Sequence, residues 1–255
     1  MNRYNWTLIA QMNTDKNHTK SISVISVISV LTLLLFLVGC GADDLPELSA
    51  EELVSQTAVS LQNHPHANFA IERQGAPAYV DPDHTLAFRR AEGQYQAPDK
   101  AKAAVRIIAP GIVADVDVIS IGNIQWQTNV LTGEWEELPP NWGFNPAVLF
   151  DPETGLQAIL ANDLHDVTVI GTEKLDGIDG ELYAVKGTAS GEHLSAMSGG
   201  LIEAETAVVH LWIAPETFDL RRVTVTEPMA DGEEDRVWVV DFEFEEETAV
   251  IEPPG

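Results

Sequence analysis

Short runs in which apolar and polar residues alternate recur through the chain after residue 66. In 112–119, Asp115 and Asp117 alternate with apolar residues, and the same pattern returns in 222–226 and 238–245. Because successive side chains of a strand point to opposite faces, this pattern predicts strands with one wet and one apolar face. Three such runs lie within 102–129, separated by Pro110-Gly111 and Gly122-Asn123. The remaining predicted strands are 67–72, 84–90, 167–171, 181–187 and 207–213.

Helical patterns are fewer. Ser49 and Glu52 have the spacing of a capping box, and apolar residues then recur at helical spacing as far as Leu61. A second helix is predicted to open at Asp151-Pro152-Glu153, with Asp as the cap and Pro at the first helical position. The Gly- and Ser-rich segment 187–200 is predicted to be the most flexible part, either a mobile flap or a long hairpin loop.

This arrangement predicts an α+β fold. About ten short strands and two helices, with no regular βαβ order, favour a curved antiparallel sheet or a partly closed barrel. Both helices are amphipathic, so each must pack its apolar stripe against the sheet.

The N-terminus has the layout of an export signal. Residues 1–20 carry Arg3, Lys16 and Lys20, and residues 21–38 contain no charge. This uncharged run ends in Leu37-Val38-Gly39-Cys40, which resembles the lipobox of bacterial lipoproteins, and Cys40 is the only cysteine in the chain. We therefore expect a cleaved signal peptide at 1–39, a lipidated tether at 40–47 with Cys40 as the lipid anchor, and one domain at 48–252. A transmembrane helix followed by a buried cysteine is the alternative.

Charge narrows the list of partners. The chain has 14 Lys+Arg against 40 Asp+Glu, a formal net charge of −26. Nucleic-acid affinity rests largely on Lys and Arg, so we do not expect DNA or RNA as a partner. For the same reason we do not expect a polybasic segment to attach the protein to anionic lipid. We expect the protein on the extracytoplasmic face of a bacterial cell membrane, held there by its lipid anchor.

Candidate chemistry is sparse. The histidines form no HExxH motif, and the sequence contains no G-x-S-x-G elbow, Walker A loop or G-x-G-x-x-G. His64 and His66 with Asp81 and Asp83 could bind a metal, but a polar turn is the preferred interpretation. Ser195 near His193 leaves a hydrolase as a minor alternative. We expect no catalysis, no metal and no cofactor.

Several stretches carry a resemblance to a known family. They are 92–100, 116–122, Trp126–Asn129 with Thr132–Trp135, Phe150–Leu156, Leu175–Gly177 with Tyr183, and Leu211–Ile213 with Arg221–Val223. Through them, most of 48–252 resembles the LppX/LprA/LprF/LprG lipoprotein family, which is similar in fold to the lipoprotein carriers LolA and LolB.

The resemblance implies a strongly curved antiparallel sheet, a half-open β-barrel, with short helices covering its concave face around a hydrophobic cavity. It also implies a monomer that binds an acylated lipid or glycolipid there and carries it across the cell envelope, with a membrane transporter as a possible partner. The side chains expected to line the cavity are Leu53, Val54, Leu61, Val116, Val118, Trp126, Leu156, Ile159, Leu160, Val223, Val225, Trp238 and Phe242. The alternative is a surface-anchored interaction or lipoprotein-sorting factor with a filled core and no lipid.

Overall fold

The structure is a computed structural model that describes residues 47–255, apart from 82, 140–144, 231 and 248. The predicted signal peptide and Cys40 lie outside the described residues. Residues 47–255 form one compact unit.

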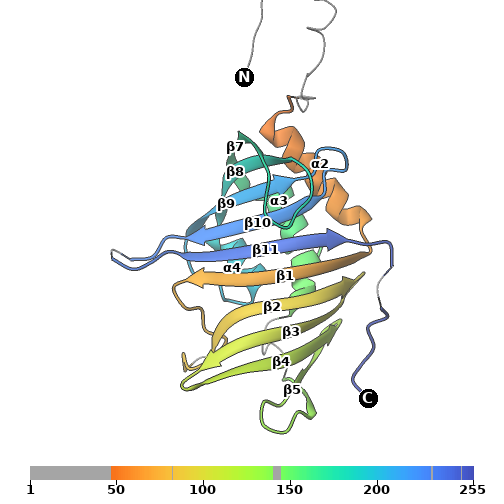
Figure 1. The fold of residues 1–255 in the computed structure, drawn as a ribbon, viewed down its shortest axis with the longest axis vertical. Helices are drawn as coiled ribbons and strands as arrows, with labels where there is room; N and C mark the ends of the chain where they lie inside the picture. Colours follow the sequence, from red (N-terminus) through yellow and green to blue (C-terminus); the bar gives the residue numbers. More distant parts are fainter. Residues whose placement is uncertain (1–46, 82, 140–144, 231, 248) are drawn as a thin grey trace, which may run out of the picture. The chain divides into compact units, whose positions relative to one another are not determined.

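Eleven antiparallel strands form one sheet, in the order β6-β5-β4-β3-β2-β1-β11-β10-β9-β8-β7 (Figure 1). The strands are β1 (His66–Gly75), β2 (Ala87–Gln96), β3 (Lys100–Ala109), β4 (Ile112–Ile121), β5 (Ile124–Thr128), β6 (Trp135–Glu137), β7 (Leu164–Glu173), β8 (Leu182–Ser190), β9 (Thr206–Ile213), β10 (Leu220–Glu227) and β11 (Arg236–Phe244). The edge strands are β6 and β7. The N-terminal half of the sheet (β1–β6) joins the C-terminal half (β7–β11) where β1 pairs with β11.

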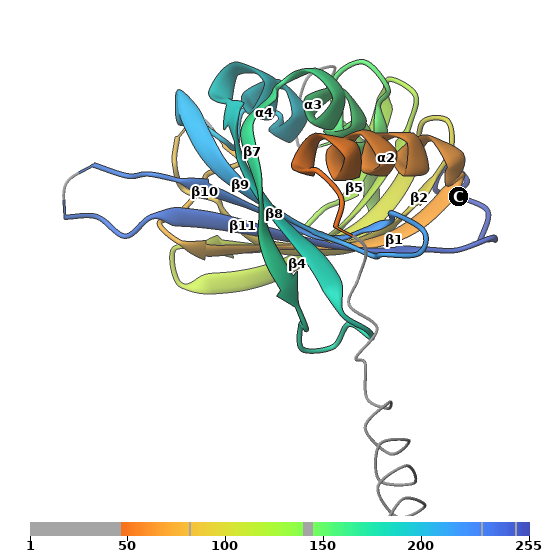
Figure 2. The same cartoon turned by 90° about the horizontal axis from the view of Figure 1, so that it is seen from above.

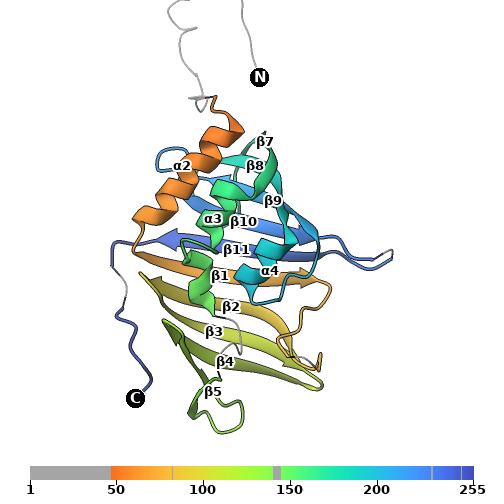
Figure 3. The ribbon, with the colours of Figure 1, turned by 180° about the vertical axis from the view of Figure 1, so that it is seen from behind.

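The helices lie on one face of this sheet (Figures 2 and 3). They are α2 (Ala50–Asn63), α3 (Leu156–Asn162), α4 (Gly191–Ser198) and the short 3-10 helix η1 (Pro146–Phe150). The predicted cap is confirmed at α2, where the Ser49 side chain accepts a hydrogen bond from the Glu52 backbone N–H at 3.1 Å. Leu53 and Val54 turn inward from α2 and are buried.

The alternation read from the sequence sets which face is covered. Val116 and Val118 of β4, Val223 and Val225 of β10, and Phe242 of β11 are all buried, while Asp117 and Glu243 are exposed on the other face. Burial of one strand face against helices removes its apolar side chains from water, which is the main favourable term for this layer arrangement. The α+β class, the antiparallel sheet and its helical cover are therefore confirmed. Strong curvature into a half-barrel remains a prediction.

Two helix predictions need correction. The second predicted helix begins at Leu156 rather than at Asp151, because the Asp151 carboxylate accepts hydrogen bonds from the backbone N–H groups of Glu153 and Thr154 and forms a turn instead. Segment 187–200 is not a loop. It completes β8 and then forms α4, which is capped by the Ser190 side chain and ends at Gly199 in the left-handed conformation.

The strands also depart from prediction. Residues 84–86 precede β2, and that strand runs on to Gln96. A register shift between Phe88 and Arg90 interrupts its pairing with β3 and displaces the simple alternation. β6 has three residues, too few for a periodic pattern, and was not predicted.

Candidate functional site

An open cleft lies at the C-terminal end of α2. This Tyr95 cleft has a volume of about 570 Å³, within the range of small-molecule sites. Its lining comes from α2 and the turn that follows it, the end of β2 and the turn that follows it, η1 and α3. The residues are Leu61, Gln62, Asn63, His64, Pro65, Tyr95, Ala97, Pro98, Leu149, Phe150, Pro152 and Gln157. Among these lining residues there is no Lys, Arg, Asp or Glu. The cleft is therefore suited to a largely apolar group.

Stacked aromatic rings form one wall of the Tyr95 cleft. The Tyr95 and Phe150 rings stack with centroids 4.0 Å apart, and Phe150 meets Phe242 edge-on at 6.0 Å. The Tyr95 hydroxyl donates a hydrogen bond to the Pro98 carbonyl at 2.8 Å. Burial, together with the negative charges of Asp99 and Asp151, raises the pKa of Tyr95 to about 12. The phenol is held neutral, with its polar end satisfied and its ring facing apolar neighbours.

A second cleft adjoins the first through Asn63 and His64, which line both. This Asp219 cleft has a volume of about 430 Å³ and lies between α2 and the β9–β10 turn. The Asp219 carboxylate accepts a hydrogen bond from the Ser60 hydroxyl at 2.5 Å and lies 2.8 Å from His64 Nε2. Burial alone would raise the pKa of Asp219, but hydrogen bonds from Ser60, Thr217 and His64 outweigh it and hold that pKa below its ordinary value.

This serine, histidine and aspartate do not form a hydrolytic relay. A catalytic triad uses one imidazole nitrogen for the carboxylate and the other for the nucleophile. Here His64 Nε2 faces both Asp219 and the Ser60 hydroxyl, the latter at 3.4 Å. The cluster instead ties the end of α2 to the β9–β10 turn. His193, the histidine of the hydrolase alternative considered from the sequence, lies 3.1 Å from the Asp163 carboxylate. That carboxylate also accepts a hydrogen bond from the Ser190 backbone N–H.

Within the part of the chain that the structure describes, no group of three or more His, Cys, Asp or Glu residues is placed to hold a metal ion. Of the candidate metal-binding set His64, His66, Asp81 and Asp83, one histidine and one aspartate have other partners. His64 bonds Asp219, and the Asp81 carboxylate accepts hydrogen bonds from the backbone N–H groups of Thr85 and Leu86.

Most of the predicted cavity residues lie together in the layer between helices and sheet. Leu61 is the one of them that lines the Tyr95 cleft, as far as the described residues show. Trp126 is half-buried on β5. The buried members of the predicted set are Leu53, Val54, Val116, Val118, Leu156, Ile159, Leu160, Val223, Val225, Trp238 and Phe242. These side chains are buried. That they line a lipid-binding cavity remains a prediction.

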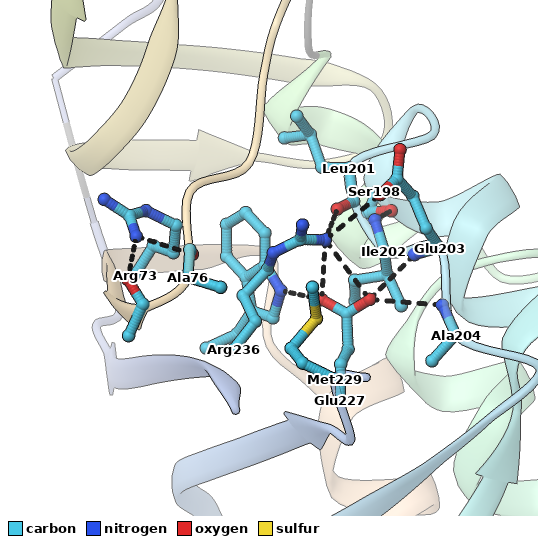
Figure 4. Close-up of polar contacts among 12 residues, drawn as sticks. Arg73, Ala76, Ser198, Leu201, Ile202, Glu203, Ala204, Glu227, Met229 and Arg236 are labelled. Atoms are coloured by element: carbon cyan, nitrogen blue, oxygen red, sulfur yellow. Dashed lines mark hydrogen bonds and ion pairs between the residues drawn. The ribbon is translucent and has the colours of Figure 1, made fainter. Parts of the chain in front are cut away.

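A buried charged network, which sequence reasoning missed, fixes the segment after α4 (Figure 4). Glu227 is 1% exposed and Arg236 5% exposed. The Glu227 carboxylate accepts hydrogen bonds from the backbone N–H groups of Glu203 and Ala204 at 2.8 and 3.2 Å, and from Trp238 Nε1 at 2.8 Å. Arg236 lies 3.4 Å from the same carboxylate and donates to the Leu201 carbonyl.

The sequence gives one partial signal for this network. Glu227 is the last residue of β10 and Arg236 the first of β11, so they flank the turn and are paired directly across the hairpin. Opposite charges at paired positions of a hairpin attract, so this ion pair could be predicted from the sequence. The bonds from Glu203 and Ala204 to Glu227 could not, because they join residues more than twenty positions apart. The network anchors α4 and its following turn to the sheet.

The family model of the LppX_LprAFG lipoproteins matches residues 49–248. The chain belongs to the LppX_LprAFG lipoprotein family. Membership of this lipoprotein family implies a location in the cell envelope. Among curated protein sequences, none is significantly similar to the chain. Among the described residues, no helix combines the length and the apolar character needed to cross a bilayer.

Solved structures of LppX_LprAFG lipoproteins have the same fold. LprF from Mycobacterium bovis superimposes with a TM-score of 0.62 at 14% identity, over 80% of this chain and 96% of that one. LppX from Mycobacterium tuberculosis superimposes with a TM-score of 0.56 at 14% identity, over 80% and 98%. A LolA-superfamily protein from Nitrosomonas europaea aligns with a TM-score of 0.29, too low to support a conclusion.

Proposed function

We propose that this protein is a membrane-anchored lipoprotein that binds an acylated lipid or glycolipid and carries it across the cell envelope. In this proposal Cys40 is the lipid anchor after removal of residues 1–39, residues 40–47 are the tether, and 48–252 bind the lipid. An acyl chain enters at the Tyr95 cleft and extends between the helices and the sheet, which form a half-open barrel around it. The buried residues predicted from the sequence line that path.

One observation carries the proposal: the Tyr95 cleft opens at the edge of the apolar layer between helices and sheet. Its aromatic wall continues through Phe150 to Phe242, whose side chain is buried in that layer. The lining contains no Lys, Arg, Asp or Glu, so an acyl chain entering there meets no carboxylate, ammonium or guanidinium group, whose desolvation costs the most.

The energetics require matched burial rather than catalysis. Each methylene that leaves water gains roughly 0.8 kcal/mol, so a chain of about sixteen methylenes loses on the order of 13 kcal/mol if it crosses water unprotected. A carrier that supplies an apolar lining of similar affinity to the membrane keeps both extraction and release near neutral. Apolar side chains suffice for this task.

Binding of a fluorescent long-chain acylglycerol to residues 47–255 tests the proposal. We expect saturable binding, and we expect Gln157→Trp to weaken it at least tenfold by filling the Tyr95 cleft, which Gln157 lines. Gln74→Trp places the same bulk on an exposed position of β1, on the sheet face away from the helices, and should leave binding unchanged. Absence of saturable binding, or equal binding by both variants, would refute the proposal.

A further inference from the structure

The β3–β4 hairpin ends in an uncharged apolar tip. Residues 107–114 read Ile-Ile-Ala-Pro-Gly-Ile-Val-Ala, eight positions without charge in a chain of net charge −26. Three large side chains of this tip are exposed: Ile108 at 38%, Ile112 at 50% and Val113 at 61%. Exposed apolar side chains that cluster at one projecting point are typical of interaction sites rather than of ordinary surface.

The exposed side chains cover both faces of the hairpin tip. Ile108 and Val113 are paired across the two strands and therefore point to the same face, while Ile112 is one position further along and points to the other. The turn between them contains Pro110 and Gly111, and Gly111 has open space around it. A projection that is apolar on both faces suits a medium that is apolar all around it, whereas a protein partner would cover one face.

Charges flank the tip in a definite arrangement. At its base Arg106 and Asp115 form a two-bond ion pair, with both N···O distances 2.7 Å, so the pair neutralises itself. The β1–β2 loop and the β10–β11 turn lie at the same end of the sheet (Figure 1). Their acidic residues include Asp81, Asp83, Glu233, Glu234 and Asp235. These carboxylates repel an anionic surface and leave an uncharged one accessible.

We infer that the tip of the β3–β4 hairpin docks into the interfacial region of a lipid bilayer rich in uncharged or zwitterionic lipids. Membership of a lipoprotein family places such a surface close to the protein. The depth is limited to the interface, because the unpaired backbone groups of the turn would lose their hydrogen bonds to water in the hydrocarbon core. The tip lies at the opposite end of β3 from the Tyr95 cleft, so this surface is separate from the proposed lipid-binding site.

Vesicle flotation of residues 47–255 tests this inference without any contribution from an N-terminal lipid. The probes are phosphatidylcholine vesicles and vesicles with an added fraction of phosphatidylglycerol. We expect binding to phosphatidylcholine, weaker binding to the anionic vesicles, and partial recovery of the latter in high salt. Ile112→Ser with Val113→Ser should reduce binding about tenfold or more, since each large apolar side chain contributes about one to two decades when fully buried.

The matched control is Ile124→Ser, an equally exposed isoleucine at 46% that lies on β5 outside the tip. It should bind vesicles as the unchanged protein does, and thermal unfolding should show that all three proteins are folded. In Val113→Trp, the emission of the new indole should shift to the blue on addition of phosphatidylcholine vesicles. The inference is overturned if vesicles do not bind, if the tip variant binds normally, or if the tip instead drives dimerisation detected by sedimentation.

Discussion

Replacing Glu227 by Ala should destabilise the fold more than any surface substitution. The change removes the acceptor shared by Trp238 Nε1 and the backbone N–H groups of Glu203 and Ala204. It also removes the buried carboxylate beside Arg236, which then keeps, within the described part of the chain, only the exposed Glu203 carboxylate at 3.4 Å. Arg236 already has a buried Nε with no hydrogen-bond partner among the described residues. The network therefore has little capacity to absorb the loss.

The expected magnitude follows from the burial of both groups. Breaking a buried ion pair by removing one partner costs about 3–5 kcal/mol in the free energy of unfolding. For a domain of about 200 residues, each kcal/mol lowers Tm by roughly 2–4 °C, so the midpoint should fall by about 6–20 °C. Thermal unfolding of residues 47–255 followed by circular dichroism measures this shift.

Two companion variants make the reasoning refutable. Asp115→Asn breaks an exposed ion pair with Arg106 and should leave Tm nearly unchanged, because exposed pairs contribute little. Glu227→Leu combined with Arg236→Met also removes the buried guanidinium, so it should recover part of the loss. The rest should persist, because Trp238 Nε1 and the Glu203 and Ala204 N–H groups still lack their acceptor. Hydrogen exchange should also quicken at the Glu203 and Ala204 amides in Glu227→Ala. A Tm shift no larger than that of Asp115→Asn would show that the network does not stabilise the fold.

Three further predictions concern other parts of the chain. The raised pKa of Tyr95 contributes stability that is present below pH 10 and is lost as the pH rises towards about 12, so urea unfolding at a series of alkaline pH values should show a fall in stability that Tyr95→Phe reduces. Gly191→Ala should lower Tm by about 2–12 °C, for a cost of about 1–3 kcal/mol, because its Cβ would lie 1.6 Å from the Ala204 carbonyl oxygen; an unchanged melting curve would contradict this. Cys40→Ser should abolish lipidation. The protein should then move from the membrane fraction to the soluble fraction if the signal peptide is still removed by another route, or otherwise accumulate as an unprocessed precursor. Mass spectrometry of the N-terminus distinguishes a lipidated form from both.

The sequence predicted those features that depend on neighbouring residues. Alternation in β4 and β11 identified the buried faces because a half-buried strand repeats every two residues. α4 was missed although its signals are local: Ser190 caps it and Gly199 ends it. Its many Gly and Ser residues suggested a loop, and packing of Leu194 and Met197 against the rest of the fold overrides that weak propensity.

The features that the sequence did not predict depend on distant residues. The Tyr95 cleft combines the ends of α2 and β2 with η1, so its volume follows from how well these elements fill the space between them. The Ser60 and Asp219 contact joins residues 159 positions apart. Leu61 was assigned to the cavity because it follows the helical spacing of α2 and because the family resemblance implies a cavity on that side. Nothing in the local sequence distinguishes Tyr95 or Phe150 from ordinary core aromatics.

The pairing of β1 with β11 has a consequence for the order of assembly. These two strands lie side by side at the middle of the sheet, with partners such as Phe69 and Phe242 that are separated by most of the domain. On either side of them, the other strand pairs join neighbours in the sequence and can form as soon as each hairpin is synthesised. A chain that emerges from the ribosome N-terminus first therefore exposes the free edge of β1 until the last strand has been made. During this interval a chaperone or a misplaced strand would compete for that edge.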